Sequence, residues 1–125
     1  MHRSRLRAVL IDAPSDDFTA EAEFWGSTLG RSLSRQPDDA HPYLGLMPGD
    51  RGVRVSLQRV DDAARVHLDI ETDDVEAEAS RLEGLGARRV EAVEDWVVMR
   101  DPAGLLFCVI PVDGSDFPQE AATWE

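Results

Sequence analysis

The chain has 125 residues, of which 42% are hydrophobic and 30% charged, and this composition is typical of one folded domain. Its 25 acidic residues outnumber its 13 basic residues, all of them arginine, and the formal net charge is −12. A charge of this sign is repelled by phosphate backbones and anionic lipid surfaces. We therefore expect partners to be neither nucleic acids nor membranes.

The sequence gives no indication of export or membrane insertion. No apolar run approaches the ~20 residues that span a bilayer, and the apolar residues 8–13 are interrupted by Asp12 and too few for a signal peptide. The single cysteine, Cys108, excludes a disulfide within the chain and is typical of a reducing compartment. We expect a cytoplasmic protein.

The first half predicts a strand, a helix and three more strands. Residues 6–12 have the length and apolar content of a buried strand, and residues 14–17 form a turn that caps the next helix. That helix ends at Gly30 and has one face formed by Phe18, Ala22, Trp25 and Leu29, with Phe18 and Trp25 expected in the core. Short strands follow near residues 31–35, 43–47 and 53–60.

The second half repeats this order. Residues 66–70 predict a strand, residues 72–74 a capping turn, and the acidic run from Glu71 to Glu78 the solvated side and first turn of a helix. The helix face is formed by Val75, Ala79, Leu82 and Gly86, and strands follow near residues 87–92, 96–100 and 105–110. A duplicated unit of ~50–55 residues explains this order; the alternative is chance similarity of two strand–helix units. The fold class is α+β.

The last residues lack hydrophobic periodicity. We expect residues 113–125 to form a C-terminal arm, on the surface or frayed. Phe117 and Trp124 are unusual in a solvated tail, and either this subunit or a neighbour can cover them.

Four pieces of the sequence, in their order and spacing, resemble the vicinal oxygen chelate superfamily, and particularly its glyoxalase-like branch. They are Phe24-Trp25 through Leu29-Gly30, Arg65 through Ile70, Leu85-Gly86-Ala87, and Asp101 through Cys108. The resemblance implies one glyoxalase-like domain (residues 1–112) of two tandem βαβββ modules, about residues 5–60 and 64–111. It also implies a curved mixed sheet around a cleft, with the helices on the outer face.

The resemblance also identifies four strand positions that hold a metal in relatives. Here they are occupied by Leu10, Ser56, His67 and Cys108, and Cys108 stands where relatives often carry a glutamate. Leucine has no donor atom and a neutral serine is a poor ligand. We therefore expect no cofactor and no metal; the alternative is a divalent metal at His67 and Cys108, with Asp69 as a third ligand.

Strand alternation extends this set of positions. If His67 faces the cleft, so does Asp69, and the parity of Ser56 brings Arg54 and Gln58 to the same side. Trp96 lies near a strand end, where it either stacks on a flat ligand or packs in the core. The predicted cleft residues are Leu10, Arg54, Ser56, Gln58, His67, Asp69, Trp96 and Cys108. His67 as a structural residue and Cys108 as a small buried hydrophobe are the alternatives for those two positions.

These residues favour a binding protein of the glyoxalase/bleomycin-resistance type, which holds a small, partly aromatic molecule without a metal and serves in sequestration or resistance. The acids Asp12 and Asp69 favour a cationic ligand, which Arg54 would offset. The resemblance implies a homodimer. The alternative function is a lyase, isomerase or dioxygenase that uses His67 with or without a divalent metal; a third is an accessory domain without a ligand.

Overall fold

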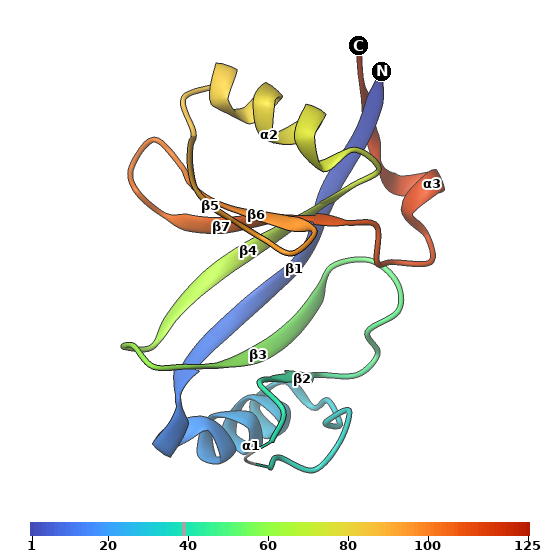
Figure 1. Ribbon diagram of the computed structural model, residues 1–125. Coiled ribbons are helices and arrows are strands. Elements are labelled where there is room, and N and C mark those ends of the chain that lie inside the picture. The colour runs from blue at the N-terminus through green and yellow to red at the C-terminus, as the bar shows by residue number, and fades with distance from the viewer. Residues whose placement is uncertain (39) are drawn as a thin grey trace. The chain divides into compact units, whose positions relative to one another are not determined.

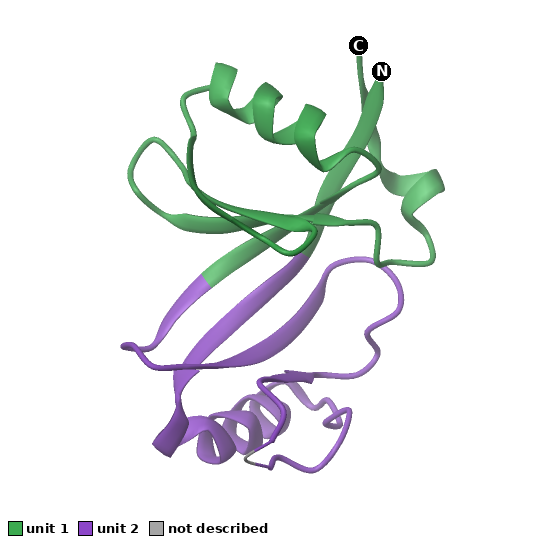
Figure 2. Cartoon of the chain, in the orientation of Figure 1, with its two compact units in different colours: residues 1–7, 67–125 green, residues 8–66 purple. Residues whose placement is uncertain are grey.

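The computed structural model describes residues 1–38 and 40–125, and within them the chain has an α+β fold with a mixed sheet of eight strands (Figure 1). The chain divides into two compact units, unit 1 with residues 1–7 and 67–125 and unit 2 with residues 8–66 (Figure 2). Strand β1 (His2–Pro14) contributes residues to both units. Among the described helices, none has the length and hydrophobicity needed to cross a bilayer.

Unit 2 contains the second part of β1, a 3₁₀ turn (Ser15–Asp17), α1 (Phe18–Leu29), β2 (Tyr43–Gly45) and β3 (Arg54–Val60). Strand β3 pairs parallel with β1 and antiparallel with β2. Helix α1 has the predicted bounds and ends at Gly30, whose φ of 65° is the left-handed conformation that glycine adopts without strain. The Asp17 side chain makes no capping hydrogen bond, so the expected cap is replaced by the 3₁₀ turn.

The strand predicted at residues 31–35 is reduced to one bridge between Leu33 and Leu46. The N–H of Arg31 donates to the carbonyl of Gly26 at 2.9 Å and so belongs to the end of the helix rather than to the sheet. Only the residues around Leu33 therefore reach the sheet, where Leu33 packs against the core of unit 2. The prediction of a full strand here was wrong.

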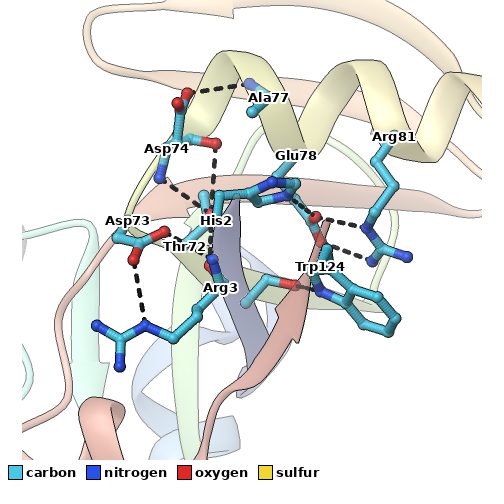
Figure 3. Close-up of polar contacts among 10 residues, drawn as sticks. His2, Arg3, Thr72, Asp73, Asp74, Ala77, Glu78, Arg81 and Trp124 are labelled. Atoms are coloured by element: carbon cyan, nitrogen blue, oxygen red, sulfur yellow. Dashed lines mark hydrogen bonds and ion pairs between the residues drawn. The ribbon is translucent and has the colours of Figure 1, made fainter.

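Unit 1 contains most of β4 (Arg65–Thr72), then α2 (Val75–Gly84), β5 (Arg88–Val93), β6 (Trp96–Arg100) and β7 (Leu106–Pro111). Its strand order is β4–β7–β6–β5, with β4 and β7 parallel and the other pairs antiparallel. Strand β1 thus pairs parallel with β3 in unit 2 and β4 with β7 in unit 1, and one helix follows each of β1 and β4. Unit 1 thus has βαβββ connectivity, and unit 2 has the same order with the single bridge at Leu33 in place of one strand, in agreement with the predicted repeat. The Asp74 side chain accepts a hydrogen bond from the N–H of Ala77 and caps α2, as predicted (Figure 3).

The residues after Val112 form α3 (Phe117–Glu120) and β8 (Ala122–Trp124), and β8 pairs antiparallel with the start of β1. Phe117 is only 2% exposed. The indole N–H of Trp124 donates to Ser4 Oγ at 2.9 Å, and the guanidinium of Arg81 lies 3.8 Å from its ring centroid. The arm is therefore packed on unit 1 rather than frayed, because its two aromatic side chains are covered within the same unit.

The carboxylate of Glu78 on α2 is fully buried, which contradicts the prediction that the run from Glu71 to Glu78 is solvated. It accepts hydrogen bonds from His2 Nε2 at 2.8 Å and from Arg81 at 2.8 and 2.9 Å (Figure 3). Burial opposes ionisation, but hydrogen bonds from Arg81, Ser4 and His2 outweigh it and lower the pKa of Glu78 from 4.5 to about 2. Glu71, at the start of the same run, is fully buried as well.

Each unit buries its apolar side chains between its helix and one face of its strands. In unit 2 these are Ala13, Phe18, Ala22, Leu44, Leu46 and Leu57, with Trp25 partly buried beside them. In unit 1 they are Ala79, Val97, Met99, Phe107 and Val109. Phe18 and Trp25 thus lie at the core as predicted, whereas Leu29 is 45% exposed. The opposite strand faces are consequently available to polar residues.

Two neighbouring valines on β6 allow a test of which face of the strand packs in the core. Val97 is buried against α2, whereas Val98 is half-buried on the opposite face. We expect Val97→Ala to lower the free energy of unfolding by about 2 kcal/mol and Val98→Ala by less than about 1 kcal/mol. Urea unfolding of both variants measures this, and equal losses would contradict the assignment of faces.

The low pKa of Glu78 predicts acid-sensitive stability. Since the folded pKa lies below the unfolded one, the contribution is complete above pH 4.5 and is lost as the pH falls towards about 2. We expect Glu78→Gln to cost about 3 kcal/mol at pH 7, because it leaves Arg81 and His2 without their buried partner. The difference from the unmodified protein should shrink below pH 4.5. Glu76→Gln is the control on the same helix, where the exposed pair with Arg89 should contribute little.

Candidate functional site

The candidate site in unit 1 is the sheet face opposite α2, which we call the inner face of unit 1. Asp69 on β4 is the register partner of Cys108 on β7, and Cys108 in turn is the partner of Val98 on β6. Register partners share a face of the sheet. Leu68, Val97 and Val109 pack against α2, so Asp69, Cys108 and Val98 lie on the inner face by strand alternation.

Three polar side chains gather at one place on this face. His67, Asp69 and Cys108 each offer a ligand atom, and these atoms all lie within 4.8 Å of one another. His67 Nε2 is 3.6 Å from Asp69 Oδ1. His67 is 7% and Asp69 8% exposed, whereas Cys108 is half-buried. The cluster therefore combines an imidazole, a carboxylate and a thiol in a place largely removed from water.

The donor types of this cluster fit a transition metal such as zinc. Catalytic zinc sites hold the ion with three protein ligands drawn from His, Cys and carboxylates, and keep the fourth position open. Leu10 and Ser56, the other two positions taken from the resemblance, add no ligand to this set. Leucine has no donor atom, and a neutral serine is a poor ligand. Asp69 supplies the third ligand atom, which His67 and Cys108 alone do not provide.

Beyond Asp69, the polar series on β4 continues with Glu71, which has no exposed surface. Its carboxylate accepts hydrogen bonds from Arg5 Nε at 2.6 Å, Asp113 N at 2.7 Å and Gly114 N at 2.9 Å. Arg5 also donates to Asp116 at 2.6 Å. Sequence reasoning placed Glu71 in a solvated run, and the signal that could have found it is its parity with His67 and Asp69.

The rest of the inner face is mainly apolar and half-buried, with Arg100, the register partner of Leu106, at the end of β6. It includes Val98 and, by strand alternation, Trp96 on β6 and Leu106 and Ile110 on β7, all of intermediate exposure. The same strands are buried on their other face, at Val97, Met99, Phe107 and Val109. Trp96 therefore does not belong to the core cluster of unit 1. The inner face combines the polar cluster at β4 and β7 with an apolar surface along β6 and β7.

The other predicted site residues lie in unit 2, on the face of β1 and β3 opposite α1. Leu10 and Ser56 are register partners and are 3% and 6% exposed. Arg54 and Gln58 flank Ser56 at alternate positions on β3, while Val55 and Leu57 pack towards α1. Each unit thus gathers four of the eight predicted residues on one sheet face.

The two registers also refine the repeat. Leu10 pairs with Ser56 as Asp69 pairs with Cys108. With Ser56 aligned to Cys108, these registers place Leu10 opposite Asp69, whereas alignment of the starts of α1 and α2 places Leu10 opposite His67. Asp69 joins the donor cluster because it lies on the same face of β4 as His67.

Comparisons with known proteins agree with this architecture. The sequence matches the model of the glyoxalase-like domain family over residues 8–110. No curated protein matches it.

Similar solved structures include a hypothetical protein from Bacillus halodurans C-125, with a TM-score of 0.62, 10% identity and coverage of 87% of this chain and 94% of that one. A Mn(II)-bound glyoxalase from Novosphingobium aromaticivorans has a TM-score of 0.61 and 23% identity over 91% of this chain and 41% of that one. Methylmalonyl-CoA epimerase from Mycobacterium tuberculosis has a TM-score of 0.56 and 18% identity over 85% and 86%. At these identities the likeness shows the fold alone. The family match over most of its length, together with this fold, establishes that the chain belongs to the glyoxalase-like domain family of the vicinal oxygen chelate superfamily.

Proposed function

We propose that the protein binds a small, partly aromatic molecule on the inner face of unit 1 without a metal. The observation that carries this proposal is the juxtaposition of the cluster His67, Asp69 and Cys108 with half-buried apolar side chains on β6 and β7. Ligand sites combine a mainly apolar surface with a few convergent polar groups. The proposal includes sequestration as the role and a homodimer as the assembly, as the family resemblance implies, and the cytoplasm as the location, which the single cysteine favours.

The two parts of the surface have different tasks in this proposal. Trp96 provides a large aromatic face on which a planar ring can stack. His67 and Asp69 supply hydrogen-bonding atoms that fix the polar end of the ligand, and the buried position of both strengthens such bonds. A carboxylate at this end favours a ligand that carries a hydrogen-bond donor or a positive charge.

Planar dyes of opposite charge test this function. We expect proflavine, a cation, to bind with a micromolar dissociation constant in the presence of EDTA, and 8-anilinonaphthalene-1-sulfonate, an anion, to bind more weakly. Trp96→Leu should weaken proflavine binding about fivefold, because it removes the stacking face. Fluorescence titration measures both constants.

Leu105→Ala, in the exposed turn before β7, is the matched control and should leave the constants unchanged. Failure of both dyes to bind, or binding that EDTA abolishes, would contradict a metal-free binding protein. An equal effect of the Trp96 and Leu105 variants would place the dye elsewhere.

A second candidate function is metal-dependent catalysis, and the three-donor cluster is the observation that favours it. A divalent ion there would act as a Lewis acid towards a bound oxygen atom. His67 and Asp69 would hold the ion through nitrogen and oxygen, and Cys108 through sulfur. Without the ion, the imidazole of His67 is the group suited to proton transfer near neutral pH.

Cobalt titration tests the second function. It predicts one equivalent of bound Co²⁺ with a sulfur-to-cobalt charge-transfer absorption that Cys108→Ser abolishes and Asp69→Asn weakens. The absorption is a readout independent of any activity. The absence of stoichiometric Co²⁺ or Zn²⁺ binding by the reduced protein would eliminate this function and leave the first one.

A further inference from the structure

A groove with a volume of about 480 Å³ lies on the helix side of unit 2. Helix α1, strands β1 and β3, and Ala64 with the first two residues of β4 form its walls. Its lining residues are Val9, Ile11, Glu21, Trp25, Leu29, Val55, Ala64, Arg65 and Val66. Val9 and Ile11 alternate with Leu10 along β1, so the groove and the predicted site residues of unit 2 lie on opposite faces of the strand.

The groove is mostly apolar, and its size suits a small molecule. Ile11, Trp25 and Val55 pack against the core of unit 2 and form a floor that is already ordered. Leu29 is 45% and Val66 48% exposed, so large apolar side chains face solvent. Ligand pockets in proteins have volumes of roughly 300–1,000 Å³ and mainly apolar walls.

The polar groups of the groove leave it negatively charged. The indole N–H of Trp25 donates to Glu21 Oε2 at 3.2 Å, which holds the ring beside the carboxylate. Arg65, the cationic residue of the lining, is paired with Asp12 at 3.1 Å and with Asp62 at 3.5 Å. These two carboxylates offset its charge, so the carboxylate of Glu21 gives the groove a net negative charge.

We propose that this groove binds a hydrophobic organic cation, namely an aromatic or alkyl group that carries a quaternary or protonated amine. Apolar walls take up the hydrocarbon part, which removes apolar surface from water. The ammonium group lies between Glu21 and the face of Trp25, where the carboxylate and the negative face of the indole ring both attract it. The net charge of −12 raises the local concentration of such cations.

A pair of probes with the same shape and different charge tests this site. The cation is 4-hydroxybenzyltrimethylammonium, and the uncharged analogue is 4-neopentylphenol, in which carbon replaces the ammonium nitrogen. The indole N–H signals of Trp25, Trp96 and Trp124 are followed in ¹H–¹⁵N NMR spectra of the whole chain. We expect the cation to shift the Trp25 signal saturably, and to bind at least about fivefold more tightly than the analogue.

Two variants on α1 provide the comparison. Glu21→Gln should weaken cation binding about fivefold and leave binding of the analogue unchanged, because only the cation contacts a charge. Glu23→Gln is the matched control, since Glu23 is an exposed acid on the same helix outside the groove. A third variant, Ala64→Phe, should block both probes by filling the groove, with its fold checked by the unchanged Trp124 signal.

The outcomes that overturn the proposal are distinct from those that concern the inner face of unit 1. Equal affinity for the two probes, equal effects of the Glu21 and Glu23 variants, or no saturable shift of Trp25 would each refute the cation site. A shift confined to Trp96 would also refute it and would instead favour the binding surface in unit 1. The absence of a saturable shift of the Trp25 signal would therefore not affect the proposed function of unit 1.

Discussion

The arrangement of unit 1 depends on the buried carboxylate of Glu71. A charge that leaves water costs several kcal/mol unless partners replace its hydration, and here Arg5 and two backbone N–H groups do so. These bonds join β1, β4 and the chain after β7. A Cβ atom at Gly114 would overlap Nη2 of Arg5 and lie 3.3 Å from Cζ of Arg7, so a side chain there would displace the Arg5 guanidinium from Asp116. Glu71 is thereby committed to structure, which confines the candidate chemistry of β4 to His67 and Asp69.

Strand alternation is the part of the architecture that the sequence predicts best. Because successive side chains of a strand point to opposite faces, one correctly placed residue determines the orientation of its neighbours. Leu68 and Ile70 pack on the helix side of unit 1, and Val55 and Leu57 on that of unit 2, as predicted. The bounds of α1 follow equally from local signals, namely the spacing of Phe18 and Ala22 and the glycine at its end.

Features that depend on distant partners were not predictable from local pattern. Glu78 reads as solvated because its partner His2 lies 76 positions away, and Glu71 because Arg5 lies 66 positions away. The C-terminal arm has no periodicity, since its order comes from Phe117 and Trp124 packing on other elements of unit 1. The full strand predicted around Leu33 does not form for the opposite reason. The local sequence favours a strand, but the N–H of Arg31 bonds to the end of the helix instead of to the sheet. The groove beside Trp25 required the positions of four separate chain segments.

The duplicated units have diverged in what their equivalent positions can do. At the paired positions of the parallel strands, unit 2 has Leu10 and Ser56, whereas unit 1 has Asp69 and Cys108. Only the second pair offers strong donor atoms, and His67 adds a third from the same strand as Asp69. A polar ligand or an ion can thus be held by two adjacent strands of unit 1, whose register is fixed by backbone hydrogen bonds. Such a site needs no donor atom from β1 or β3, so Leu10 and Ser56 do not have to coordinate a ligand. The strands that carry them instead contribute to the packing of unit 2 and to the floor of its groove.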